Sequence, residues 1–305
     1  MRHVLVVHYS QSGQLNKIVD AVTAPLLEQE GIEVDYLALQ MQEQFPFPWP
    51  FWHFFHIFPE AALQQPQPMQ PITIDANKRY DLVILAYQVW FLAPSLPMTS
   101  FLASEHARKL LKHTPVMTLI GCRNMWLMAQ EKVKLRLQQH GALLVDNAVL
   151  TDECGSAASF LATPMWMFTG KQRAYTWLPK AGIAEQEIHA SQRFGHAITQ
   201  RLLRDNEPIT QPMLSGLGAV KVNEKLIASE KIGNRSFQVW GRLLRQLGTQ
   251  HSFSRSVGLC IYIVFLLAMI VTVVPVSALI KKIIAPITRK KSAQQKKYFA
   301  APSGE

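Results

Sequence analysis

The chain has only three cysteines in 305 residues, Cys122, Cys154 and Cys260, and they show neither the close spacing of a metal site nor a paired framework. We therefore expect no metal site and no disulfide-stapled secreted domain, and a reducing compartment is the simplest interpretation. The sequence also opens directly on a strand-like run, without the apolar core and cleavage site of a secretory signal, so we expect no signal peptide.

Acidic residues are scarce in the last third of the chain. Residues 1–207 hold 17 Lys and Arg against 18 Asp and Glu, residues 208–280 hold 7 against 2, and residues 281–305 hold 7 against 1. The basic residues responsible for the formal charge of +10 therefore flank the one long apolar segment, and this distribution argues against a nucleic-acid partner. A basic region beside an apolar segment is typical of contact with an anionic membrane.

Buried strands alternate with amphipathic helices over the first two thirds of the chain. The apolar patterns predict helices from residue 15 and at residues 97–112, 128–140 and 185–204, and strands at residues 3–9, 32–37, 80–87, 115–120 and 142–150. Five strands with helical crossovers favour an α/β fold with a doubly wound parallel sheet.

The loop after the first strand carries hydroxyl groups and a glycine immediately before a helix. It consists of Ser10, Gln11, Ser12, Gly13, Gln14 and Leu15. Backbone N–H groups at such a helix start converge on one point, and Gly13 allows close approach, so the loop predicts an anion site. It lacks the lysine of a Walker loop and the glycine spacing of a dinucleotide fold. The spacing resembles the FMN-phosphate loop of flavodoxin-like proteins; an ordinary capped turn is the alternative.

Two further loops leave the same predicted edge of the sheet, where ligands of doubly wound sheets bind. The candidate cofactor residues in them are Gln88, Val89, Trp90 and Phe91 in one, and Gly121, Cys122, Arg123 and Asn124 in the other. By resemblance to flavodoxin-like proteins, Trp90 is the expected stacking residue for a flavin ring, with loop packing as the alternative. Arg123 is expected to face a flavin carbonyl or a substrate oxygen, unless it is a solvated loop charge.

Two aromatic-rich stretches, residues 45–60 and 152–182, interrupt the α/β pattern. We expect both to be irregular, the first because of its prolines, and we expect them to meet over the cofactor edge. The candidate substrate-pocket residues are Trp49, Trp52, Phe55, Trp126 and Trp166. The alternatives are a cap on the core or a segment that dips into a bilayer. His53 and His56 are candidate catalytic residues, although packing or lid roles come first.

The C-terminal third is predicted to be a membrane attachment. The expected divisions are a cofactor domain at 1–207, a basic amphipathic connector at 208–256, a membrane-embedded helix at 257–280 and a basic tail at 281–305. We expect a membrane-associated protein whose catalytic domain lies in the cytoplasm. Either the tail crosses the membrane against the charge rule, or the helix bends at Pro275 and both ends stay on one side.

Three motifs together resemble the flavodoxin-like enzymes of dialkylresorcinol biosynthesis, usually called dialkylresorcinol-condensing enzymes. They are residues 7–15, the insertion that ends in Phe58, Pro59 and Glu60, and residues 121–126. The resemblance covers about residues 1–205 and does not include the membrane segment. It implies FMN as cofactor and the two-electron oxidation of a dialkyl cyclohexanedione to a resorcinol. A ketosynthase-type partner would supply this lipid-like substrate, and Arg123 or a nearby histidine would stabilise an enolate.

Two other functions fit the same residues. One is a membrane-associated NAD(P)H:quinone or flavin reductase whose aromatic pocket receives a quinone ring. The other is a flavin-free scaffold that holds a lipid-synthesis complex at the membrane. Flavodoxin-like enzymes often complete their site as homodimers, so a homodimer is a further expectation from the resemblance.

Overall fold

The computed structural model describes residues 1–152, 154–155, 158–204 and 207–304, without the side chains of residues 273–275 and 277–288. Its five parallel strands run in the order β2-β1-β3-β5-β6, and the two-residue β4 pairs antiparallel with β3. The strands are β1 (Arg2–His8), β2 (Ile32–Ala38), β3 (Leu82–Trp90), β4 (Ala93–Pro94), β5 (Pro115–Cys122) and β6 (Leu143–Thr151). This is the flavodoxin-like order of a doubly wound sheet, so the predicted fold class is confirmed, with β4 added.

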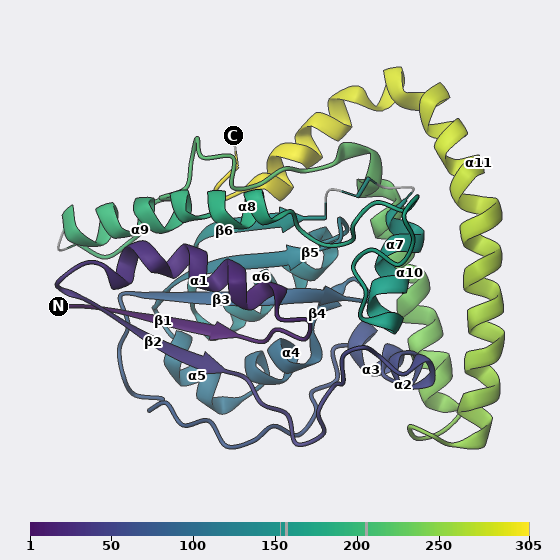
Figure 1. Ribbon diagram of the computed structural model, residues 1–305, viewed down its shortest axis with the longest axis horizontal. Helices are drawn as coiled ribbons and strands as arrows, with labels where there is room; N and C mark the ends of the chain where they lie inside the picture. Colours follow the sequence, from purple (N-terminus) through teal and green to yellow (C-terminus); the bar gives the residue numbers. More distant parts are fainter. Residues whose placement is uncertain (153, 156–157, 205–206, 305) are drawn as a thin grey trace.

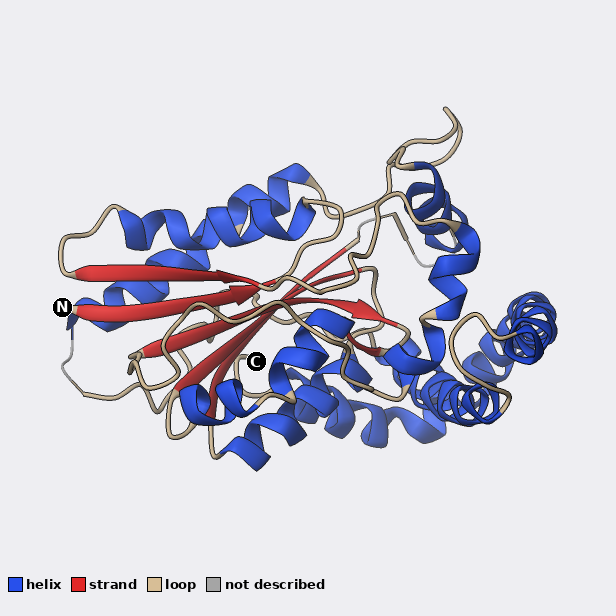
Figure 2. Cartoon of the chain, turned by 90° about the horizontal axis from the view of Figure 1, so that it is seen from below, coloured by secondary structure: helices blue, strands red, loops and turns tan. Residues whose placement is uncertain are grey.

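Helices cover both faces of the sheet (Figure 1 and Figure 2). On β1, the fully buried Val4 and Val6 face one apolar cluster, and Leu5 and Val7 face the other, because successive side chains of a strand point to opposite faces. One face is covered by α1 (Gln14–Leu27), α8 (Glu185–Ala190) and α9 (Gln192–Arg204), and the other by α4 (Leu96–Leu102), α5 (Glu105–Leu111) and α6 (Leu127–His140).

Two helices predicted as continuous are interrupted in the structure. The helix expected at 97–112 divides into α4 and α5, and the hydroxyl of Ser104 caps α5 by accepting from Ala107 N at 3.1 Å. The helix expected at 185–204 divides into α8 and α9 around Ser191, whose hydroxyl donates to Ile188 O. In both places a serine side chain competes for the backbone groups of the helix.

The aromatic stretches form helices, so the prediction of irregular structure was wrong. The first contains α2 (Phe51–His56) and α3 (Phe58–Ala62), and the second contains α7 (Ser159–Thr169). Pro50 is the N-cap of α2, and Pro59 lies in the first turn of α3. Proline is tolerated there because the N–H it lacks has no helical partner.

Residues 208–222 belong to the core of the domain and not to a separate connector. Ile209, Leu214 and Ala219 are buried against the face that α1 covers. The carboxylate of Asp146 in β6 accepts from the backbone N–H of Leu214 at 3.2 Å, and Val149 N donates to Ala219 O at 2.8 Å.

The chain then forms two long helices, α10 (Glu224–Gln246) and α11 (Phe253–Ala300). In α10, Ile227 joins the core cluster and Leu244 packs against the aromatic insertion, so this helix is docked along its length. In Figure 1, α11 arches away from the domain and returns to it. Its segment Phe253–Thr272 is long and apolar enough to cross a membrane, with a mean hydropathy of 2.2.

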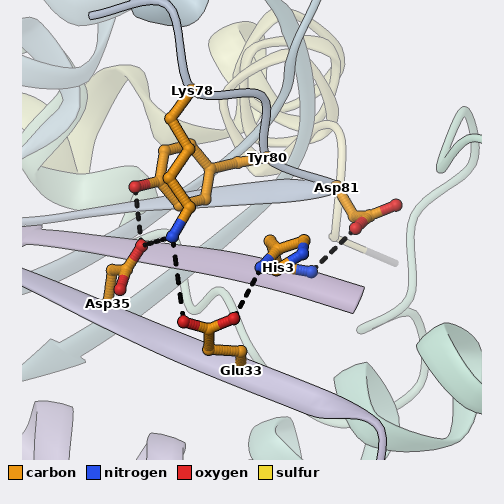
Figure 3. Close-up of polar contacts among 6 residues, drawn as sticks. All are labelled: His3, Glu33, Asp35, Lys78, Tyr80 and Asp81. Carbon is orange, nitrogen blue, oxygen red and sulfur yellow. Dashed lines mark hydrogen bonds and ion pairs between the residues drawn. The ribbon is translucent and has the colours of Figure 1, made fainter. Parts of the chain in front are cut away.

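A polar cluster holds β1, β2 and the start of β3 together at the edge of the sheet opposite the predicted site (Figure 3). Lys78 lies 2.6 Å from Asp35, which also accepts from the Tyr80 hydroxyl at 2.7 Å. His3 pairs with Glu33 at 3.0 Å. The Lys78 hydrogen bond lowers the pKa of Asp35. These contacts are structural, since they fix neighbouring strands.

Candidate functional site

The loop after β1 presents unpaired backbone donors at the start of α1. Gly13 is the N-cap of this 14-residue helix and has a φ of 79°, which favours glycine. The hydroxyl of Ser10 accepts from Leu15 N at 3.2 Å. The N–H groups of Ser12, Gly13 and Gln14 donate to no acceptor among the residues that the structure describes. A Cβ on Gly13 would meet nothing within 4 Å, so there is open space beside these donors.

The two glutamines of this loop fix it to neighbouring segments. The side-chain Nε2 of Gln11 donates to Pro46 O at 2.9 Å, and the backbone N–H of Gln11 donates to the side-chain Oε1 of Gln88 at 3.3 Å. The Gln14 side chain donates to Ile183 O and accepts from Ile183 N, both at 3.0 Å. The side chains of three predicted cofactor residues, Gln11, Gln14 and Gln88, thus hold the loop in place.

The predicted loop after the third strand is a tight β-hairpin. β3 continues to Trp90, Val89 pairs with Pro94, and the turn places Phe91 and Leu92 at φ values of 49° and 59°. Two successive residues with positive φ are the mark of a type I′ turn, which matches the twist of the flanking strands. The segment of residues 88–91 is therefore a rigid edge of the sheet.

Trp90 lies in a group of aromatic rings contributed mainly by the insertion. Its ring centroid is 5.1 Å from that of Phe45, 5.4 Å from Trp49 and 6.0 Å from Tyr9, and all three pairs are edge-to-face. The neighbouring Phe91 packs on Phe54, with a distance of 4.7 Å between the ring centroids. Trp90 is half-buried, so it borders the site while its ring is already partnered.

The loop after β5 begins where the strand packs against α1. Gly121 is the last but one residue of β5, and a Cβ there would lie 3.1 Å from the side chain of Leu15, so this glycine allows α1 to approach the sheet. Cys122 and Asn124 are half-buried beside it, and burial raises the pKa of the Cys122 thiol. Gly121 therefore allows close packing of α1, and the predicted approach of a cofactor to its backbone stays a prediction.

Arg123 is a fixed, partly buried cation. Its Nε donates to the Ser159 hydroxyl at 2.8 Å, and its guanidinium lies 4.2 Å from the centroid of the Phe160 ring. Burial lowers the pKa of Arg123, and the nearby Asp152 opposes this shift. Arg123 is therefore not a solvated loop charge.

Asp152, which the sequence analysis did not select, organises the loop after β6. Its carboxylate accepts from Cys154 N at 2.8 Å and from Gly182 N at 3.0 Å, and its own N–H contacts the carbonyls of Cys122 and Arg123 at 3.1 Å. It is 8% exposed. The signal that could have identified it is a carboxylate directly after the last buried strand.

The candidate histidines lie in different surroundings. The His53 ring is 5.5 Å from that of Trp49, and burial lowers its pKa, which favours the neutral form. His56 is buried, and its ring lies 4.7 Å from that of His251. Burial also lowers the pKa of His56, whose carbonyl accepts from Arg255. His53 faces the ring group around Trp90, whereas His56 belongs to the contact between α2 and α11.

The structure separates the five predicted pocket residues. Trp49 and Phe55 are buried among the rings of the insertion, and Trp166 packs 5.8 Å from Phe47, so the two aromatic stretches do meet as predicted. Trp52 is 49% exposed, and its ring contacts that of Phe51 at a centroid distance of 5.5 Å. Trp126 was assigned wrongly: it is 1% exposed and packs in the core under α6, because it is the last residue before that helix.

Two cavities lie away from the loops after β1 and β5. One of about 220 Å³ is bordered by Glu43 and by Phe45 and Glu60 of the insertion, and Phe45 also contacts Trp90. The other, of about 360 Å³, is bordered by Arg2, Asp81 and other residues at the opposite edge of the sheet. Among the described residues, no three His, Cys, Asp or Glu side chains are grouped as metal ligands.

Comparison with known proteins finds distant structural likenesses. No protein-family model and no curated protein matches the chain. A flavoprotein in complex with FMN from Lactobacillus acidophilus matches with 17% identity and a TM-score of 0.39, over 49% of this chain and 93% of that one. A putative flavoprotein from Bacteroides uniformis matches with 12% identity and a TM-score of 0.38, over 54% and 97%. A flavodoxin from the Archaea has 9% identity and a TM-score of 0.36, over 67% and 99%. The strand order by itself assigns the fold.

Proposed function

We propose that the chain binds FMN at the carboxyl edge of the sheet and acts as a flavin-dependent oxidoreductase. The observation that carries this proposal is the set of N–H groups of Ser12, Gly13 and Gln14 at the start of α1, which have no acceptor in the described part of the chain. They lie at the end of β1, beside β3, where the strand order reverses and where this fold places its ligands. A helix N-terminus with free donors suits a phosphate.

The other end of the cofactor would lie between the β3 hairpin and the loop after β5. Trp90 borders this position and Gln88 links it to the phosphate loop. When bound, FMN supplies two-electron hydride chemistry. The rings around Trp90 exclude water, and Arg123, held by Ser159 and Phe160, provides a fixed positive charge for an enolate oxygen.

The aromatic stretches favour an apolar substrate. Phe45, Trp49 and Phe168 belong to a ring group that extends from Trp90 to α10 and α11, and each alkyl methylene buried against such rings contributes about 0.8 kcal/mol. This supports the oxidation of a dialkyl cyclohexanedione, which loses two electrons and two protons to become a dialkylresorcinol. We propose that a ketosynthase-type enzyme supplies the dione, and that two copies of the chain form the active protein.

We also propose that the protein is membrane-associated, with the sheet domain in the cytoplasm. The apolar segment Phe253–Thr272 supports membrane attachment, and only 22% of it is buried against the rest of the chain. A substrate that partitions into lipid is accessible to an enzyme held at the bilayer.

The test compares two glycine variants of the purified full-length protein. Gly13 and Gly31 both have positive φ values, 79° and 93°, and a Cβ on either meets nothing within 4 Å. Gly31 lies before β2, at the opposite edge of the sheet, and is the matched control. We expect Gly13→Val to lose FMN, read by the flavin absorption spectrum and by titration, while Gly31→Val retains it.

Equal FMN binding by both variants, or a parent protein that takes up no FMN, would overturn the proposed cofactor site. Turnover of a dialkyl cyclohexanedione to a resorcinol tests the substrate. Rapid NAD(P)H-dependent quinone reduction without dione turnover would assign the protein to the reductases instead.

A further inference from the structure

Helix α11 is attached to the domain at both of its ends. At its start, Arg255 pairs with Glu60 of α3, its Nη1 lying 2.9 Å from Oε1. At its end, the Tyr298 hydroxyl donates to Glu131 of α6 at 2.7 Å, and Phe299 is buried in the core cluster under α6. α3 and α6 are themselves in contact, since Lys132 Nζ lies 3.5 Å from Ala62 O.

The segment after α11 is also part of the fold. The Ser303 hydroxyl contacts Asp146 at 2.7 Å and accepts from Asn147 N at 2.5 Å, and all three residues are buried. Asp146 is the carboxylate that also holds residues 213 and 214, and burial raises its pKa. If the chain end left the domain, the buried Asp146 carboxylate would lose its hydrogen bond from the Ser303 hydroxyl.

These contacts require α11 to be an arch. A straight helix of 48 residues would be about 72 Å long, more than twice the ~30 Å of a bilayer core. It would carry Tyr298 far from Arg255, yet both residues contact one domain. Figure 1 shows the helix curving over and returning to the sheet. The sequence contains Pro275 and Pro286, and each proline removes an N–H from the helical ladder.

The two limbs of the arch have different surfaces. The first exposes apolar side chains at 45–72% of their area: Val257, Ile261, Val264, Leu267 and Val271. The second limb is basic, since residues 281–304 contain seven Lys and Arg and no acidic residue. Arg289, Lys290 and Lys291 are exposed on it.

We propose that α11 is a re-entrant membrane element that enters one leaflet and leaves on the same side. Its apolar limb contacts the acyl chains, and its basic limb lies at the headgroups of anionic lipids. The inference rests on the proposed membrane association but is independent of FMN. A bilayer fits better than a second copy of the chain, because a second copy would bring two basic limbs together, whereas lipid phosphates are complementary to them.

The side of the membrane that each end occupies tests this topology. Single cysteines are introduced at two exposed sites, Glu30→Cys in the domain and Gln294→Cys on the basic limb, in a Cys260→Ser background. Sealed vesicles from expressing cells, with the cytoplasmic face outward, are treated with a membrane-impermeant maleimide, and the labelled peptides are identified by mass. We expect both cysteines to be labelled before detergent is added.

Labelling at position 30 with protection at position 294 until detergent is added would show a spanning helix and overturn the inference. If the protein is absent from the vesicles altogether, the proposed membrane association fails as well. FMN binding by the same preparations is read separately, so loss of the cofactor proposal leaves the topology result intact.

A vesicle-binding measurement tests the headgroup contact. Lys290→Gln with Lys291→Gln is compared with a matched double variant at the end of α5, Lys109→Gln with Lys112→Gln, whose lysines are also exposed. With phosphatidylserine in phosphatidylcholine vesicles, the first pair is expected to weaken partitioning about 30-fold, because each lysine near an anionic surface contributes roughly fivefold. The headgroup contact would be overturned if both double variants partitioned equally. It would also be overturned if the parent protein partitioned as well into neutral vesicles as into vesicles that contain phosphatidylserine.

Discussion

Arg255 joins α11 to the aromatic insertion through a contact from which water is excluded. Its side chain is 1% exposed and that of Glu60 is 13% exposed. The guanidinium donates to both carboxylate oxygens of Glu60, and Nη2 also donates to His56 O at 2.6 Å. Nearby, Tyr262 of the same helix stacks on Phe58 with a centroid distance of 4.4 Å.

Removal of either charge leaves the other one buried and unpaired. We expect Arg255→Met to lower the free energy of unfolding by about 3–5 kcal/mol, because the Glu60 carboxylate then has no cation. Glu60→Leu should cost a similar amount, because it leaves the buried guanidinium without a carboxylate and the Arg255 Nε already lacks an acceptor among the described residues. The double variant Arg255→Met with Glu60→Leu replaces the pair by apolar groups and should lie within about 1 kcal/mol of the parent. The coupling energy between the two positions is therefore expected to exceed about 3 kcal/mol.

Urea unfolding of the full-length protein in detergent measures this cycle, with the summed fluorescence of the seven tryptophans as the readout. The exposed Arg245 of α10 provides the control, since Arg245→Met should change the free energy by less than about 0.5 kcal/mol. The reasoning is refuted if Arg255→Met costs less than about 1 kcal/mol, or if the double variant costs the sum of the single ones.

Three other substitutions test the packing and the charges of the domain. Gly195→Ala should lower the free energy of unfolding by about 3 kcal/mol in thermal denaturation, because a Cβ there would lie 2.1 Å from Val22 O of α1; an unchanged melting temperature contradicts the close contact of α1 and α9. Burial raises the pKa of Glu230 from 4.5 to about 7, so the stabilising contribution of its protonated form is complete below pH 4.5, and about 3 kcal/mol of it is lost as the pH rises through 7. Glu230→Gln should remove this dependence, and urea midpoints that still fall with pH would exclude Glu230 as its source. The pKa of Asp35 is lowered by Lys78, so the pair stabilises the fold above about pH 3.8 and its contribution disappears in more acidic solution. In Asp35→Asn, the free energy of unfolding that is lost on acidification should be smaller than in the parent by no more than about 1 kcal/mol, because the pair is partly exposed. An equal loss in parent and variant would show that the contact does not stabilise the fold.

The sequence by itself determined the sheet and the start of the candidate site. Strands such as residues 82–87 are continuous apolar runs, which require cover on both faces, and this requirement leads to a doubly wound parallel sheet. The hydroxyls and the glycine of residues 10–13 directly precede a helical pattern, so the position of the unpaired donors followed from local order. These features depend on neighbours in the chain, and periodicity reports them directly.

The tertiary structure alone decided how the apolar surfaces are covered. The sequence predicted Trp90 and Trp126 in loops after strands, but only the structure shows that Trp90 ends β3 and borders the site and that Trp126 is core. It also could not show that α11 returns to the sheet, because the contact of Arg255 with Glu60 joins residues 195 positions apart. Periodicity identifies the apolar side of an element, whereas the partner that buries it is chosen by the free energy of packing among all elements at once.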